Sequence, residues 1–150
     1  MDLYTQMVRD EDIRYLPYLD SLGNGTIGIG HKIKTGENFS SVVALSLGQV
    51  NALYNTDMGA VQYQLGAYSW FNLLDDIRQA SMKNMGFNLG VVGLLHFPSM
   101  IHYLSLGDWT NASAQALSSE WAIQLSYDPK NPLASRPGRI ARQILTGDWV

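Results

Sequence analysis

The chain has 150 residues, of which 46% are hydrophobic and 15% charged, and its formal net charge is −3. This composition is typical of a globular domain with a sizeable core, and the absence of a basic tract argues against a nucleic-acid partner. No cysteine is present, which excludes disulfides, thiolate metal sites and cysteine nucleophiles.

The first third of the chain predicts a helix followed by a hairpin. Apolar residues at helical spacing predict a helix over residues 3–11, with Glu11 continuing its apolar face. Residues 15–19 read as an edge strand containing Pro17, residues 21–25 as a turn, and residues 26–31 as the return strand. Residues 35–45 read as a loop.

The remaining residues predict helices. Ser46 and Gln49 have the spacing of a capping box at the start of a long helix over residues 46–66. Further helices are expected at about 70–78, 80–90, 92–96, 99–106, 109–125 and 138–146. Gly107 and Gly147 suit helix C-termini, Asp108 suits an N-cap, and prolines make residues 126–137 a loop. These elements indicate an α+β fold in which a long helix joins a small N-terminal sheet lobe to a helical C-terminal lobe.

A membrane span is not expected. Residues 84–107 carry no charged side chain, but Asn, His, Ser and Pro98 interrupt them, which favours two short buried helices and no stable membrane insertion. The first 14 residues lack the basic and apolar regions of a secretory signal.

Three polar residues, Glu11, Asp20 and Thr26, draw attention by their spacing. Glu11 lies at the end of an apolar stripe, where a partly buried carboxyl is suited to donating a proton. Asp20 and Thr26 flank the hairpin turn, so they can face each other and hold a water molecule between them. Each feature alone also fits a simpler interpretation: a surface glutamate at a fraying helix end, and ordinary turn chemistry.

Strand alternation divides the stretch TIGIGH, residues 26–31, between two faces. Thr26, Gly28 and Gly30 share one face, which would leave room for a flat polar ligand. His31 shares the other face with two isoleucines, so we expect it to be structural, with Asp57 of the long helix as its partner.

Other chemistries lack their motifs. The three histidines show no metal-ligand spacing, and neither a phosphate-binding loop nor a dinucleotide fingerprint occurs, so no metal or cofactor is expected. The remaining candidate is a pair of carboxylates, the usual equipment of glycoside hydrolysis.

The pattern E-x8-D-x5-T-x-G-x-G-H, formed by Glu11, Asp20, Thr26, Gly28, Gly30 and His31, resembles that of the tailed-phage lysozymes, the muramidases that phages use as endolysins. The segments LYNTDMGAV, NMGFNLG, GDWTNASAQALSSEWAIQ and GRIARQILTGDW are similar to later helices of the family, so the resemblance covers roughly residues 3–149.

The resemblance implies roles for the matching positions. Glu11 would be the general acid, Asp20 would position or deprotonate the attacking water, and Thr26 would help to hold that water, with inversion at the sugar. Gly28, Gly30, Asn88 and Arg139 would bind the substrate, peptidoglycan, and His31 with Asp57 would form a structural pair. The chain would be one lysozyme-like domain with an N-terminal lobe (about 12–45), a linking helix (about 46–66) and a C-terminal lobe (about 67–150, plus helix 3–11).

Several positions depart from the family's pattern. Asp12 stands where a glycine usually follows the catalytic glutamate, the loop 126–137 looks longer than in compact relatives, and Glu120 replaces a basic residue of some relatives. A non-hydrolytic peptidoglycan-binding or virion protein, and a lytic transglycosylase, remain alternatives. We expect a monomer that accumulates in the host cytoplasm and reaches the cell wall after the membrane is opened.

Overall fold

The computed structural model describes residues 1–150, which divide into two compact units. The smaller unit is Asp2–Ala60, and the larger is Met1 together with Val61–Val150. The boundary lies within one long helix, α2 (Leu47–Leu65), whose first turns belong to the smaller unit.

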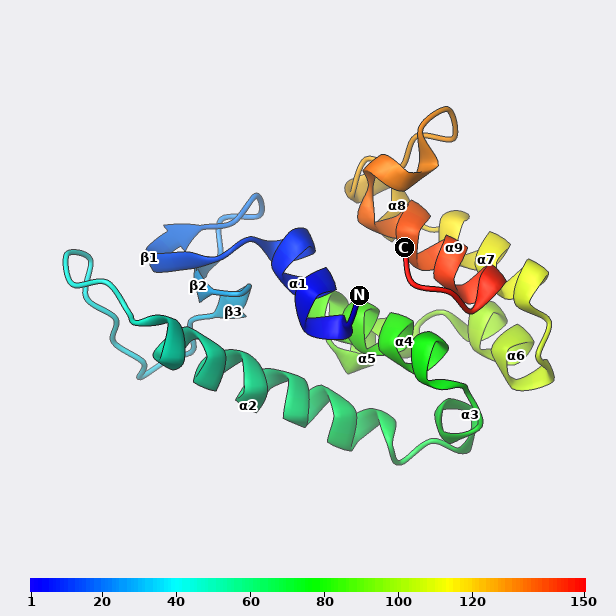
Figure 1. The fold of residues 1–150 in the computed structure, drawn as a ribbon, viewed down its shortest axis with the longest axis horizontal. Coiled ribbons are helices and arrows are strands. Elements are labelled where there is room, and N and C mark those ends of the chain that lie inside the picture. Colours follow the sequence, from blue (N-terminus) through cyan, green and yellow to red (C-terminus); the bar gives the residue numbers. More distant parts are fainter. The chain divides into compact units, whose positions relative to one another are not determined.

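The smaller unit contains the sheet. Helix α1 (Leu3–Glu11) precedes β1 (Arg14–Leu19), β2 (Gly25–Gly28) and β3 (His31–Lys32), which form an antiparallel sheet in the order β1-β2-β3. Figure 1 shows this sheet alongside the first turns of α2. The core of this unit is formed by buried apolar side chains, among them Met7, Ile27, Ile29, Val50 and Tyr54.

Local signals explain where these helices begin. The Asp2 carboxylate accepts the N–H of Thr5 at 2.8 Å and caps α1. At α2 the predicted capping box is confirmed: the N–H of Ser46 donates to the Gln49 side chain at 2.8 Å, and the N–H of Gln49 donates to the Ser46 hydroxyl at 3.1 Å.

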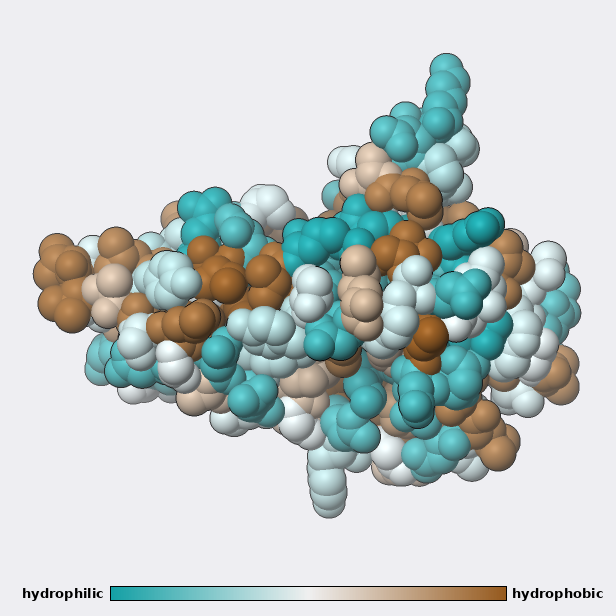
Figure 2. Space-filling view, viewed as in Figure 1, coloured by the Kyte–Doolittle hydropathy of each residue, from teal (hydrophilic) through white to brown (hydrophobic).

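A connection without helix or strand, residues 33–46, joins the sheet to α2, in agreement with the predicted loop. The N–H of Leu45 donates to the carbonyl of Tyr15 at 2.9 Å and ties the end of this connection to β1. Apolar side chains gather at the end of the unit that holds the connection (Figure 2), where Val42 and Val43 are 83% and 69% exposed. The tip of the connection therefore makes little contact with the core.

The larger unit is helical. It contains α3 (Ser69–Asn72), α4 (Asp76–Leu89), α5 (Val91–Leu95), α6 (Pro98–Leu106), α7 (Trp109–Leu117), α8 (Glu120–Gln124), the 3-10 helix η1 (Pro132–Ala134) and α9 (Arg136–Thr146). Helix α7 packs against α6 and α9, and α4 packs against α5 and α9. Gly107 and Gly147 adopt the left-handed conformation at the ends of α6 and α9, and Asp108 caps α7, as predicted. No helix combines the length and the apolar character needed to cross a bilayer.

Polar caps divide the predicted helices differently at two places. The residues assigned to helices 70–78 and 80–90 instead form α3 and α4, because the Asp75 carboxylate accepts the N–H groups of Ile77 and Arg78 and starts a new helix. The predicted helix 109–125 is two helices, because the Ser119 hydroxyl accepts the N–H of Ala122 and caps α8. The predicted loop 126–137 includes η1.

The predicted α+β architecture, a small antiparallel sheet with an otherwise helical chain, is confirmed. In the two compact units, α1 groups with the sheet, and the boundary between the units falls within α2. Two contacts within the smaller unit account for this grouping: the Tyr4 hydroxyl donates to Asn51 of α2 at 2.7 Å, and Glu11 packs against Gly30.

Candidate active site

Glu11 is the last residue of α1, and its carboxyl group lies against the backbone of Gly30. A Cβ atom at Gly30 would stand 2.8 Å from both Cδ and Oε2 of Glu11, closer than real side chains approach. Gly30 also has a φ of 66°, which favours glycine. The absence of a side chain at this position therefore makes the room that the Glu11 carboxyl occupies.

Asp20 lies directly after β1 and closes the hairpin turn through its carboxylate. Oδ1 accepts the N–H groups of Leu22 and Asn24 at 2.9 and 2.8 Å. Oδ2 accepts the ammonium of Lys32 at 2.8 Å and the Asn24 side-chain amide at 3.2 Å. The Lys32 ammonium, followed by the N–H of Asn24, holds the pKa of Asp20 well below its usual range.

Thr26 is only 2% exposed, and its hydroxyl donates to the carbonyl of Asn24 at 2.9 Å. The same carbonyl accepts the N–H of Asp20 at 2.9 Å. Asn24 therefore joins Asp20 to Thr26 across the turn, a link that the sequence analysis missed. Because a hydroxyl can accept hydrogen bonds while donating one, Thr26 keeps acceptor capacity for a water molecule, and that role stays a prediction.

The single return strand predicted over residues 26–31 is wrong. It is two short strands, β2 and β3, because Gly28 and Gly30 both adopt positive φ and turn the chain between them. The expectation of one open glycine face fails with it: a Cβ at Gly28 would stand 3.6 Å from Val50 of α2, so this glycine faces the core.

His31 is 3% exposed and lies between two carboxylates. Its Nδ1 is 2.6 Å from Oδ2 of Asp57, and its Nε2 is 3.1 Å from Oε1 of Glu37. The structure thus brings together the predicted pair and adds Glu37, whose pKa is lowered by the N–H of Lys34 and then by His31. These contacts join β3 to the connection and to α2, and the structural role of the pair stays a prediction.

Asn88 and Arg139 belong to the larger unit. The side-chain oxygen of Asn88 accepts the indole N–H of Trp121 at 2.9 Å, and a guanidinium N–H of Arg139 donates to the carbonyl of Leu133 at 3.0 Å. The Arg139 contact ties α9 to the loop before it. Roles for both residues in substrate binding stay predictions.

Tyr18 is a further residue that the sequence analysis did not select. Burial raises its pKa, and the charges of Glu11 and Asp20 add to this effect while Arg14 opposes it. The phenol therefore lies within the electrostatic influence of both predicted catalytic carboxylates. Its position on the predicted strand, two residues before Asp20, was the signal available in the sequence.

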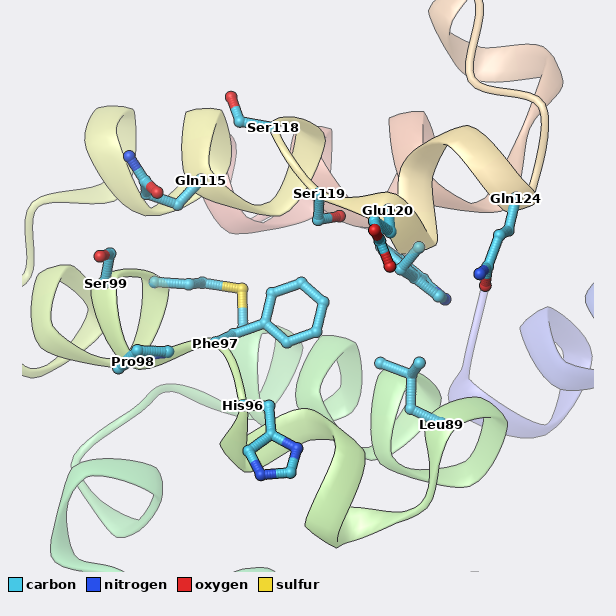
Figure 3. Close-up of a pocket in the computed structure, with 12 residues that line it drawn as sticks. Leu89, His96, Phe97, Pro98, Ser99, Gln115, Ser118, Ser119, Glu120 and Gln124 are labelled. Carbon is cyan, nitrogen blue, oxygen red and sulfur yellow. The ribbon is translucent and has the colours of Figure 1, made fainter.

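A separate hollow of about 440 Å³ lies in the larger unit, between the start of α6 and α8. Figure 3 shows the Phe97 ring projecting into it, with His96 and Leu89 on one side and Glu120 and Gln124 on the other. None of the predicted site residues lines it. No group of His, Asp and Glu side chains in the chain is arranged to hold a metal ion.

Comparisons with known proteins agree with this geometry. The family model described as phage lysozyme matches residues 9–129. The chain is 26% identical to the pre-baseplate central spike protein Gp5 of Enterobacteria phage T4, over 99% of this chain but only 28% of that protein's length. It is 22% identical to the probable T4-type lysozyme 2 of Dictyostelium discoideum, over 77% of this chain and 81% of that protein.

Proposed function

Because the chain belongs to the phage lysozyme family, a family of peptidoglycan hydrolases, we propose that it cleaves the β-1,4 bond between N-acetylmuramic acid and N-acetylglucosamine. The observation that carries this proposal is the site of the smaller unit, where the Glu11 carboxyl rests on Gly30 while Asp20 and Thr26 are held by one turn residue, Asn24.

Glu11 is the proposed general acid. It would protonate the glycosidic oxygen as the bond breaks, which a carboxyl held at one place by a helix end and a glycine is suited to do. A positioned acid of this kind contributes about a hundredfold to ten-thousandfold in rate.

Asp20 is the proposed partner of the attacking water, with Thr26 as a further acceptor. Charge-assisted hydrogen bonds keep the Asp20 carboxylate ionised, as required of a group that stabilises positive charge on the sugar and orients water. Attack by water from the face opposite the leaving group would invert the anomeric centre, in the manner of inverting glycosidases.

The decisive experiment compares wild type with Glu11→Gln on purified peptidoglycan and analyses the released muropeptides by mass spectrometry. Wild type should release fragments that have each gained one water, and Glu11→Gln should lose activity by about a hundredfold or more while remaining folded. Glu120→Gln, which removes an exposed carboxylate of the larger unit, is the matched control and should retain activity. Full activity of the Glu11→Gln variant would refute the assignment.

Two alternatives are separated by the same experiment. Anhydro-sugar products, without the mass of water, would indicate lytic transglycosylase chemistry. One relative is a central spike protein, so a virion component on this fold is the other candidate. Binding to cell walls without release of reducing sugars would support that candidate.

The biological setting proposed for the activity is lysis of the bacterial host. The enzyme would act as a monomer, first present in the host cytoplasm and reaching the wall after another protein has opened the membrane. Delayed lysis in cells expressing the Glu11→Gln variant, in place of wild type, would support this setting.

A further inference from the structure

The strand register aligns three side chains across the small sheet. Tyr18 of β1 pairs with Thr26 of β2, and Thr26 pairs in turn with Lys32 of β3. Because cross-strand partners project from the same face of a sheet, these residues form one row. The predicted water-holding threonine therefore has a lysine as its direct neighbour, and that lysine reaches Asp20.

The Asp20 carboxylate is held by four donors. Two backbone N–H groups donate to Oδ1, and the Asn24 amide and the Lys32 ammonium donate to Oδ2. Lys32 is the one cation in this set. Its side chain is 54% exposed, against 21% for Asp20, so the charged pair lies near the protein surface.

We infer that Lys32 is a positioning residue for the reaction: its ammonium fixes the orientation of the Asp20 carboxylate toward the sheet, and its charge sets the acid limit of activity. This inference rests on the proposed role of Asp20 at the attacking water. The ammonium that contacts Oδ2 comes from Lys32, the cross-strand partner of Thr26, so one residue of β3 adjoins both members of the proposed water site.

The electrostatics agree with this geometry. Among the groups that lower the pKa of Asp20, the Lys32 ammonium has the largest effect, ahead of the N–H of Asn24. The titratable side chains facing Asp20 from neighbouring strands are Lys32 on β3 and Tyr18 on β1. Tyr18 stays protonated at acidic and neutral pH because burial and then Glu11 raise its pKa. Lys32 is therefore the neighbour whose removal should change the ionisation of Asp20.

Removal of Lys32 should raise the pKa of Asp20, because the Lys32 ammonium lowers that pKa in the wild-type protein. With Lys32 present, Asp20 loses its proton at a lower pH than an ordinary aspartate, which titrates near about 3.9. Without Lys32, its pKa should rise toward that value, by about one unit or more. Asp20 would then become protonated at a higher pH than in wild type, and the acid limb of kcat/KM would move to higher pH.

The test compares wild type, Lys32→Met and Lys32→Arg by two measurements. Carbon-13 NMR follows the Asp20 carboxyl from pH 7 down to the lowest pH at which the protein stays folded, and the pH profile of kcat/KM is recorded on soluble peptidoglycan fragments. Lys34→Met is the matched control: it removes an equal charge two residues away, where the ammonium lies 3.9 Å from Asp57. Circular dichroism at each pH establishes that every variant is folded.

We expect the titration of Asp20 to move to higher pH only in Lys32→Met, with the acid limb of kcat/KM shifted upward by a similar amount, and Lys32→Arg and Lys34→Met to follow wild type. An unchanged Asp20 titration in Lys32→Met would overturn the inference whether or not the protein is active. A shifted titration with an unmoved acid limb would also overturn it, because Asp20 would then not limit the reaction. Failure of the proposed function appears separately, as full activity of Glu11→Gln.

Discussion

The backbone of Asp12, directly after Glu11, provides the sharpest test of how this chain ends its first helix. Asp12 has φ 64° and ψ 172°, a conformation that is essentially restricted to glycine. Its N–H donates to the carbonyl of Val8 at 2.9 Å, and its carboxylate accepts the N–H of Ile13 at 2.8 Å. We predict that Asp12→Gly is more stable than Asp12→Ala, the reverse of the usual order.

The difference in the free energy of unfolding between Asp12→Gly and Asp12→Ala comes from backbone strain and from the conformational freedom of the unfolded chain. Both lose the side-chain acceptor for Ile13, so that loss cancels. Alanine keeps the backbone strain, about 1–3 kcal/mol in this conformation, whereas glycine relieves it. Glycine in turn costs about 0.5–1 kcal/mol through the greater freedom of the unfolded chain. The balance favours Asp12→Gly over Asp12→Ala by about 1 kcal/mol.

Urea unfolding followed by far-UV circular dichroism measures this difference. Gly59 is the control, because it lies in α2 with ordinary backbone angles and nothing within 4 Å of an added Cβ. Gly59→Ala should stabilise the protein by about 0.5–1 kcal/mol. If Asp12→Ala proved as stable as Asp12→Gly while Gly59→Ala behaved as expected, the strain argument would be refuted.

Three further predictions concern the larger unit. Gly138→Ala should abolish folding of α9, because the added Cβ would stand 1.6 Å from the carbonyl oxygen of Pro132. The unfolding of α9 would be measured as a loss of helical circular dichroism, and an unchanged melting temperature would contradict the prediction. Arg78 donates to the carbonyl of Ile144 at 2.8 Å, pairs with Asp75 at 2.6 Å and stacks on Trp109. Arg78→Met should therefore lower the free energy of unfolding, measured in urea, by about 2–4 kcal/mol. A loss below about 0.5 kcal/mol would count against these contacts. Burial opposes ionisation of Asp75, but hydrogen bonds from Arg78 outweigh burial and lower the pKa of this carboxyl below its ordinary value of 3.8. The stability that the carboxylate contributes is therefore fully present above pH 3.8, and it is lost as the pH falls through the pKa of the folded protein. Asp75→Asn should therefore lose less stability than wild type between pH 4 and pH 2, and parallel curves would show that Asp75 does not contribute.

Local signals predicted much of the secondary structure. The capping box of Ser46 and Gln49, the cap at Asp108 and the glycines that end α6 and α9 depend on residues within one turn, so a single sequence contains the relevant information. The errors arose where local signals compete. Asp75 caps a new helix inside the predicted helix 70–78, and Ser119 caps a new helix inside the predicted helix 109–125. Apolar spacing alone predicts each of these segments to be one continuous helix.

The residues of the candidate site were found by their spacing, but their contacts were not. Asp20 and Thr26 were selected together, whereas Asn24, which links them, looks like an ordinary turn residue. Glu37 was missed because its contact with His31 depends on how the connection 33–46 folds back. Lys32 was missed because its contact with Asp20 crosses the sheet, and the register of three strands decides which side chains meet.

The amino-acid sequence by itself determined the order of elements, the α+β class and the lysozyme resemblance, because periodicity, caps and spaced motifs are properties of neighbours along the chain. Tertiary structure decided that Gly30 makes room for Glu11, that Gly28 faces the core, and that Lys32 contacts Asp20. These are contacts between residues distant in sequence, set by the positive φ of two glycines and by strand register, which no local pattern specifies.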